Sequence, residues 1–94
     1  MDVSVIIPLL NENDSLDELY SSIKKVMMSR SFSFEVIFID DGSTDNSWNI
    51  IKQLSKENES VKGIRFFKNY GKSQALHIGF LKAKGNVVFT MDAD

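Results

Sequence analysis

The clearest pattern in the sequence is Val87-Val88-Phe89-Thr90-Met91-Asp92-Ala93-Asp94, in which apolar and β-branched residues are followed by two carboxylates one residue apart. The apolar part predicts a strand over residues 86–91, buried on both faces of a sheet. Asp92 and Asp94 then lie at its carboxyl end, where open α/β sheets bind ligands. Mg²⁺ commonly uses one or two carboxylates plus substrate phosphates. From this stretch alone, a metal-bridged nucleotide-diphosphate site and a solvated acidic turn are equal alternatives.

The composition is that of one globular domain covering residues 1–94, with 43% hydrophobic and 26% charged residues. A formal charge of −2 without a basic block argues against nucleic acid as a partner. No apolar run reaches transmembrane length, and no basic segment precedes the first strand-like stretch, so we expect no signal peptide. The absence of cysteine excludes disulfides and thiolate metal sites and fits a reducing compartment.

Going back along the chain, strand-like and helix-like segments alternate. Strands are predicted over residues 3–7, 34–39, 61–67 and 86–91, the third near a sheet edge because it carries Gly63 and Arg65. Helices are predicted from Asp14, after the capping residues Ser43, Thr44 and Asp45, and over residues 73–84 with Gly85 as C-terminal cap. On the last helix, Ala75, Leu76, Gly79, Phe80 and Ala83 form the predicted inner stripe. This order predicts an α/β fold with a doubly wound, mainly parallel sheet and flanking helices.

Three of the predicted strands end in acidic or loop-forming groups, at residues 8–12, 40–42 and 92–94. In a parallel sheet these groups share one edge, and acidic groups that converge need a cationic or donor-rich ligand. The first loop has no glycine, which excludes a dinucleotide-binding G-x-G-x-x-G motif. Gly71-Lys72-Ser73 could end a P-loop, but Phe66 stands where its first glycine belongs. A metal held by carboxylates is therefore the expected means of binding phosphates.

Five segments together resemble the N-terminal half of family 2 glycosyltransferases with the GT-A fold. They are residues 3–8, 11–12, 39–45, 69–72 and 92–94, in order and with suitable spacing over the whole chain. Within that family the pattern is most similar to the polyprenyl- or dolichol-phosphate hexosyltransferases. Each motif alone is weak, and the set is specific.

The resemblance implies a nucleoside site built from the first two loops. Pro8, Leu10 and Glu12 match the first-strand loop that walls the nucleoside. Ile39 and Asp41 match a pair beside the base, where the carboxylate accepts an N–H from a uracil or guanine edge. Asp40, between this pair, is expected to support the loop structurally. Relatives often carry a small residue and an aromatic at Leu9-Leu10, so base stacking is not expected of Leu10.

Asp92-Ala93-Asp94 matches the D-x-D motif of the family, which binds ribose and diphosphate through Mg²⁺ or Mn²⁺. The resemblance implies that Asp94 is a direct metal ligand, that Asp92 acts partly through ribose or water, and that Ala93 also lines the donor site. The metal would neutralise the leaving nucleoside diphosphate as the anomeric carbon of the sugar is attacked.

The implied function is transfer of a hexose from a UDP- or GDP-sugar to a lipid-phosphate or glycan acceptor, such as a polyprenyl phosphate, on the cytoplasmic membrane face. The sequence stops at the acidic motif, so we expect an N-terminal piece of a longer enzyme. We expect this piece to be inactive alone, without catalytic residues, and to self-associate through uncovered apolar surface.

Two other functions remain open. A non-catalytic, Mg²⁺-binding signalling module similar to receiver domains would use Asp40 and Asp41 but leaves residues 8–12 and 92–94 unexplained. A nucleotidyltransferase on a similar fold is weakened by the missing glycine-rich first loop.

Three other side chains carry weaker signals. His77 has no second histidine or cysteine nearby and is expected to be an ordinary helix residue. Trp48 continues an apolar helical stripe and is expected to pack in the core rather than to hold a sugar. Lys72 follows a turn at the start of a helix, where contact with a diphosphate and full solvation are equal alternatives.

Overall fold

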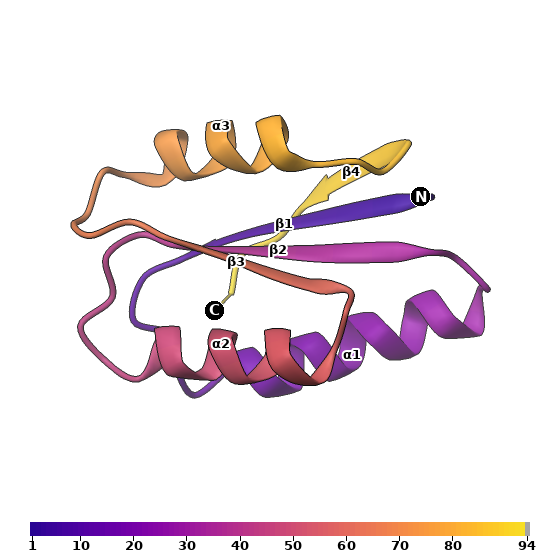
Figure 1. The fold of residues 1–94 in the computed structure, drawn as a ribbon, viewed down its shortest axis with the longest axis horizontal. Helices are drawn as coiled ribbons and strands as arrows, with labels where there is room; N and C mark the ends of the chain where they lie inside the picture. Colours follow the sequence, from indigo (N-terminus) through magenta and orange to yellow (C-terminus); the bar gives the residue numbers. More distant parts are fainter. Residues whose placement is uncertain (94) are drawn as a thin grey trace.

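The computed structural model describes residues 1–93 and shows a four-stranded parallel sheet with helices on both faces (Figure 1). The elements in chain order are β1 (Val3–Leu9), α1 (Leu16–Ser29), β2 (Phe34–Asp40), α2 (Ser47–Glu57), β3 (Val61–Arg65), α3 (Lys72–Lys82) and β4 (Val87–Thr90). The spatial strand order is β3-β2-β1-β4. The predicted doubly wound, parallel architecture is confirmed, and β3 lies at an edge as predicted.

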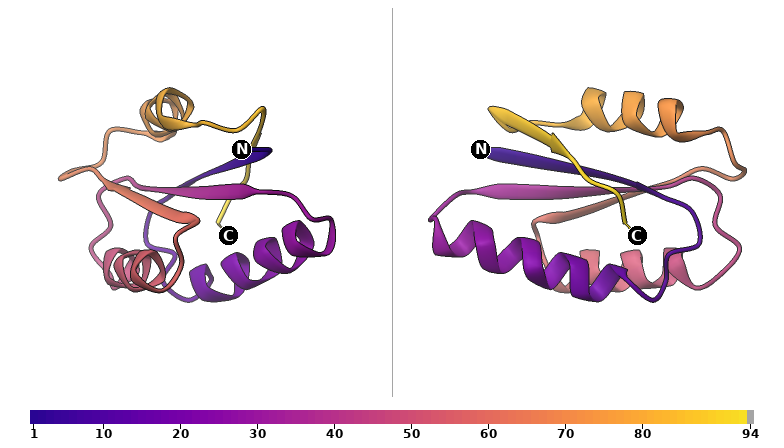
Figure 2. Two further views of the ribbon diagram at one scale, coloured as in Figure 1. Left: turned by 45° about the vertical axis from the view of Figure 1, so that its right-hand side comes forward. Right: turned by 180° about the vertical axis from the view of Figure 1, so that it is seen from behind.

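The helices form two layers, with α1 and α2 against one face of the sheet and α3 against the other (Figure 1; Figure 2). Side chains of a strand alternate between faces, so consecutive residues enter different cores. In β2, Phe38 packs in the larger core under α1 and α2, whereas Ile37 and Ile39 pack with Ala75 of α3 in the smaller core. The two central strands are buried on both faces, except for partly exposed Pro8 and Phe34, because a helix layer covers each face.

The pairing of β1 with β2 runs from Val3 opposite Phe34 to Leu9 opposite Asp40. It covers the full length of both strands, so their carboxyl ends finish side by side. A one-residue slip would exchange the two faces of a strand whose faces are both buried, which fixes this register strongly. The loops after β1 and β2 therefore start next to one another.

Two helices begin later than predicted, because the polar residues ahead of them are engaged in the loops. Ser15, not Asp14, precedes α1, and its backbone N–H donates to the carbonyl of Glu12 at 3.1 Å. Asn46 precedes α2, although Asp45 still accepts the N–H of Ser47 at 2.8 Å. In the part of the chain that is described, no helix combines the length and apolar character needed to cross a membrane.

Gly85 is not the C-terminal cap of α3, because the helix ends at Lys82 and Ala83 is the capping residue. The N–H of Gly85 instead donates to the Ser4 hydroxyl at 2.8 Å, and a Cβ on Gly85 would lie 2.5 Å from the Ser4 backbone nitrogen. Only glycine permits this approach of the α3–β4 connection to β1. Phe80, predicted on the inner stripe of α3, is exposed, whereas Gly79 is buried where a Cβ would meet Ile side chains of the sheet.

The prediction that the fourth strand is buried on both faces is wrong for the described residues. All four residues of β4 are exposed, with Val87 and Phe89 each about half accessible. The reason is topological: β4 lies at the edge opposite β3 and pairs with β1 alone. Within residues 1–93 the apolar run is thus an edge strand.

A buried carboxylate joins the elements at the amino end of the sheet. Glu35 in β2 is fully buried, and its oxygens accept from the Ser4 hydroxyl at 2.5 Å, the Lys62 ammonium at 2.6 Å and the Lys84 backbone N–H at 2.7 Å. Burial raises the pKa of Glu35, but the bonds from Lys62, Ser4 and Lys84 outweigh it and hold the pKa below its usual value. Charged Glu35 therefore ties β1, β2, β3 and the start of the α3–β4 connection together.

We predict an acid-sensitive contribution of Glu35 to stability. A carboxyl whose pKa is lowered by folding stabilises the native state above its unfolded pKa and loses that effect as the pH falls through its folded value. Urea unfolding of the wild type and of Glu35→Gln should differ most near neutral pH, and the difference should shrink below about pH 4. Asp17→Asn, on the exposed side of α1, is the control. A difference that is constant with pH would contradict a charge-based role.

Candidate functional site

The loops after β1, β2 and β4 meet the segment between β3 and α3 at one edge of the sheet. Together they enclose a cleft of about 430 Å³. Its lining residues are Pro8, Leu9, Leu10, Glu12, Asp41, Asn69, Gly71, Lys72, Asp92 and Ala93. The convergence follows from the parallel sheet, in which all strands present their carboxyl ends to the same side.

Six side chains that the sequence indicated as a nucleotide-sugar site line this one cleft. They are Pro8, Leu10, Glu12, Asp41, Asp92 and Ala93. The carboxyl groups of Glu12, Asp41 and Asp92 thus share one cleft. The residues at the end of β1 form its apolar wall. Leu10 is 42% exposed, so its apolar surface is available to a ligand.

Ile39 is a correction, because it does not line the cleft. Its side chain is fully buried in the smaller core with Ile6 and Ile37, beneath Ala75 of α3. The alternation of side chains along β2 turns it away from the loop that follows. Ile39 anchors the end of the strand that carries Asp40 and Asp41, and a side-chain contact with a base is not available to it.

Asp41 holds the loop that forms the far wall of the cleft. Its Oδ1 accepts the backbone N–H of Tyr70 at 2.7 Å, and its Oδ2 accepts the N–H of Gly71 at 3.0 Å. Gly71 has a φ of 103°, which a side chain would strain. One carboxylate therefore fixes the turn that delivers Lys72 and the start of α3 to the site.

Asp40, its neighbour, points into the protein and supports the loop, as the sequence indicated. It is fully buried, and its Oδ1 accepts the backbone N–H of Ser43 at 2.7 Å. Its Oδ2 is buried and has no hydrogen-bond partner among the described residues. The turn between them uses Gly42 at a φ of 85°, where a Cβ would lie 2.6 Å from the carbonyl carbon of Lys68.

The first loop is tied to the start of α2 by side chains of both. Asn11, at a φ of 54°, accepts the N–H of Thr44 at 2.8 Å and donates its own N–H to the Ser43 hydroxyl at 2.8 Å. The N–H of Glu12 donates to the Ser47 hydroxyl at 3.0 Å. Burial raises the pKa of Asp45, but bonds from the Ser47 hydroxyl and nearby backbone N–H groups lower it overall. The wall that carries Leu10 and Glu12 is consequently held in place before any ligand binds.

A salt bridge crosses the mouth of the cleft. The Lys72 ammonium donates to Asp92 Oδ1 at 2.8 Å, and both side chains are about two-thirds exposed. From this position the Lys72 ammonium can pair with Asp92, as it does here, or with a phosphate of a ligand in the cleft. Lys72 therefore lines the cleft, and its contact with a diphosphate stays a prediction.

The cleft also offers one of the two carboxylates that were predicted to hold a metal ion. Asp92 supplies an exposed carboxylate at the cleft, whereas Asp94, the other predicted ligand, lies outside the described residues. Within residues 1–93 no three His, Cys, Asp or Glu side chains lie close enough to hold an ion. A carboxylate oxygen such as those of Asp92 is a ligand type that Mg²⁺ takes in proteins.

Sequence reasoning missed part of the cleft, namely Leu9, Asn69 and Gly71. Leu9 is the last residue of β1 and reads as core. The segment 69–72 belongs to the resemblance, which gives Asn69 no role of its own, and the sequence predicts for Gly71 only that it serves the turn. Its position depends on the two hydrogen bonds to Asp41, a contact across 29 or 30 residues that no local pattern reveals.

The profile described as Glycosyl transferase family 2 matches residues 4–94. The chain belongs to glycosyl transferase family 2. Among its relatives, an undecaprenyl-phosphate 4-deoxy-4-formamido-L-arabinose transferase of Shewanella sediminis is 43% identical over 93 residues, which are 98% of this chain and 28% of the relative. A transferase with the same description from Pseudomonas fluorescens is 38% identical, over 98% of this chain and 27% of the relative. This family 2 chain thus spans little more than a quarter of their length.

Two solved structures superpose closely on this chain. The Staphylococcus aureus TarS fragment 1–349 in complex with UDP superposes with a TM-score of 0.84 at 28% identity, covering all of this chain and 28% of that one. A Pyrobaculum calidifontis mannosyltransferase, PcManGT, in complex with GDP-Man and Mn²⁺ gives 0.84 at 25% identity, over 98% and 27%. Family membership removes the receiver-like signalling module as an explanation of Asp40 and Asp41.

We predict that Asp41→Ala releases the loop at residues 70–71. Two backbone N–H groups lose their acceptor, which should lower the free energy of unfolding by about 1–3 kcal/mol. Hydrogen exchange at Tyr70 and Gly71 should accelerate while exchange in α1 is unchanged. Asp14→Ala removes an exposed carboxylate of the first loop and serves as the control. Unchanged exchange at Tyr70 in Asp41→Ala would show that other contacts hold the loop.

Proposed function

We propose that this chain supplies the donor site of a glycosyltransferase that moves a hexose from a UDP- or GDP-sugar to an acceptor. The observation that carries the proposal is the gathering of Pro8, Leu10, Glu12, Asp41 and Asp92 around one cleft. Support also comes from the relatives, which are described as transferases, and from TarS and PcManGT, whose complexes contain UDP and GDP-Man.

In this proposal the cleft divides into an apolar part and a charged part. The nucleoside lies against Pro8 and Leu10. The carboxylate of Asp41 accepts a hydrogen bond from an N–H of the base or an O–H of the ribose. Both Asp41 oxygens already accept backbone N–H groups, so an additional bond would use the remaining lone pairs of the same carboxylate. The diphosphate lies at the mouth of the cleft, near Lys72 and Asp92. Among the described residues that line the cleft, the ammonium of Lys72 is the positive charge that can attract it.

We further propose that a divalent cation, Mg²⁺ or Mn²⁺, is held by Asp92 and Asp94 together with diphosphate oxygens. Such an ion supplies neutralisation of the charge that develops on the leaving diphosphate. Asp92 must then exchange Lys72 for the ion, and Lys72 becomes available to a phosphate oxygen. The Mn²⁺ in the PcManGT complex supports this part of the proposal.

The acceptor is proposed to be a polyprenyl phosphate, and the site of action the cytoplasmic face of a membrane. The two relatives from Shewanella sediminis and Pseudomonas fluorescens, both described as undecaprenyl-phosphate transferases, support this choice. A phosphate on a lipid is an anionic nucleophile that can attack the anomeric carbon while the nucleoside diphosphate leaves. Among the described residues, we assign none to activation of that nucleophile.

The donor site is tested by thermal unfolding with UDP, GDP and ADP, each with Mn²⁺ and with EDTA. A ligand that binds only the native state stabilises it by about 2.7 kcal/mol at one hundred times its Kd, so the midpoint should rise by several degrees. We expect a rise with UDP or GDP and Mn²⁺, little with ADP, and loss of the rise in EDTA.

Two variants make this test specific. Asp92→Asn should abolish the Mn²⁺-dependent part, whereas Asp17→Asn, on the exposed side of α1, should leave it intact. A rise that is equal for all three nucleotides would count against base recognition by Asp41. A rise that Asp92→Asn leaves unchanged would remove Asp92 from the metal site.

We also propose that the 94-residue chain self-associates through the exposed edge of β4. A cavity of about 330 Å³ between β4 and α1 is lined almost wholly by apolar side chains, among them Ile23, Met27 and Phe89. Apolar edge strands promote pairing between copies. Sedimentation velocity should show association that increases with concentration and falls in Phe89→Lys. A monomer at all concentrations would contradict this proposal.

A further inference from the structure

The opposite edge of the sheet, β3, differs in character because basic side chains gather on both sides of it. The sequence has eleven Lys and Arg residues. Six of them lie on β3 or line the two clefts beside it: Lys52, Lys56, Lys62, Arg65, Lys82 and Lys84. No Asp or Glu lines either cleft within the described residues.

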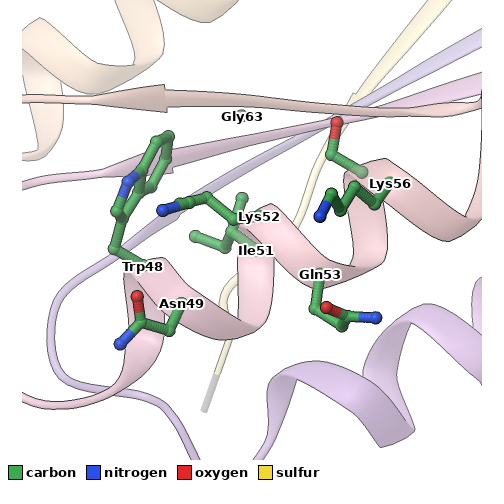
Figure 3. A pocket seen from close by; sticks show the side chains of 8 residues that line it. Trp48, Asn49, Ile51, Lys52, Gln53, Lys56 and Gly63 are labelled. Carbon is green, nitrogen blue, oxygen red and sulfur yellow. The ribbon is translucent and has the colours of Figure 1, made fainter.

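The larger of these clefts, about 620 Å³, lies between α2 and β3 (Figure 3). Trp48, Lys52 and Lys56 are one helical turn apart and form its α2 wall, with Gly63 of β3 opposite. A Cβ on Gly63 would lie 2.5 Å from Cγ2 of Ile51, so glycine is needed for α2 to pack on the strand. The Arg65 guanidinium lies 5.7 Å from the centre of the Trp48 ring.

The smaller cleft, about 220 Å³, lies between α3 and the other face of β3. It is lined by Lys62, Lys82 and Lys84 around the side chains of Ile37 and Ile64. Lys62 pairs with buried Glu35. In residues 1–93, the ammonium groups of Lys52, Lys56, Lys82 and Lys84 form no ion pair with a carboxylate.

Between the two clefts runs an open row of backbone groups. Ser60 accepts from Val36 at 2.7 Å and Phe66 donates to Asp40 at 2.8 Å, so the even-numbered residues of this segment face β2. The N–H and C=O groups of Gly63 and Arg65 then face away from the sheet. An edge of this kind is a template for a further strand.

We propose that the β3 edge is a docking surface for an extended, acidic segment of another protein. Such a segment would add as a fifth strand to β3, and its side chains would alternate between the two clefts. Carboxylates on either face would then reach lysines, on the α2 side or on the α3 side. Like charges keep two copies of this edge apart, so the partner must be of opposite charge. A membrane of anionic lipids would match the lysines but offers no backbone partner for Gly63 and Arg65.

The proposal can be tested with Trp48, the sole tryptophan of the sequence, as a fluorescent reporter in the larger cleft. The probe is acetylated, amidated hexaglutamate at low ionic strength. The matched probe is the same peptide N-methylated at every residue, which has equal charge but no backbone N–H donor on either edge. We expect saturable quenching by the first peptide and at least fivefold weaker binding of the second.

Lys52→Gln/Lys56→Gln should weaken binding of hexaglutamate by roughly fivefold, since two exposed ion pairs of modest strength are lost. Lys25→Gln/Arg30→Gln removes the same charge from α1 and the residue that caps it, outside both clefts, and should bind as the wild type does. Unfolding midpoints of both variants, whose altered side chains are exposed, should match the wild type. Hydrogen exchange should show protection of the Gly63 and Arg65 amides on binding.

Three results would overturn the proposal. Equal affinity for the N-methylated probe would show attraction by charge without strand pairing. Binding to vesicles of phosphatidylcholine and phosphatidylglycerol, without binding to hexaglutamate, would make the edge a membrane surface instead. Absence of binding to both would leave the lysines as charges that only protect an edge strand. Nucleotide binding is measured separately and does not depend on these outcomes.

Discussion

The register between β1 and β2 is the constraint on which the rest of the structure depends. Both strands are covered on two faces, so their side chains cannot shift by one residue without exchanging cores. Because Leu9 lies opposite Asp40, the chain leaves both strands at the same height. The apolar wall after β1 and the carboxylate of Asp41 after β2 are neighbours for this reason alone.

Two acidic residues that follow one another, Asp40 and Asp41, have different functions because a strand alternates its side chains. Both are buried, but Asp40 accepts the N–H of Ser43 in its own turn, whereas Asp41 accepts two N–H groups from a loop nearly thirty residues away. At the other end of β2, Glu35 accepts hydrogen bonds from β1, β3 and the α3–β4 connection and holds them together. Buried carboxylates at both ends of one central strand thus hold neighbouring strands and loops in place.

Much of this arrangement was predictable from local patterns. Apolar runs and helical stripes identified seven elements, and their alternation required a parallel sheet with loops converging at one edge. That reasoning correctly united Pro8, Leu10, Glu12, Asp41, Asp92 and Ala93. It misplaced Ile39, because a motif read along the chain does not state on which face of the strand each residue lies. It also missed the helix starts at Leu16 and Ser47, where loop hydrogen bonds compete with capping.

The two edges of the sheet show what sequence patterns cannot separate. Val87, Val88 and Phe89 have the composition of a buried strand, and the topology alone makes β4 an edge with apolar surface exposed. β3 carries Lys62 and Arg65, with further lysines from α2 and α3 beside it. Lys52 and Lys56 come from α2, and Lys82 and Lys84 come from the end of α3 and the connection after it, on the opposite face of the sheet, so the grouping of these four lysines exists only in three dimensions. Charge discourages pairing of β3 with a copy of itself and permits pairing with a strand of opposite charge, whereas the apolar β4 has no such discrimination. Pairing at the β3 edge is therefore selected by the charge of the partner, whereas pairing at the β4 edge depends only on burial of apolar surface.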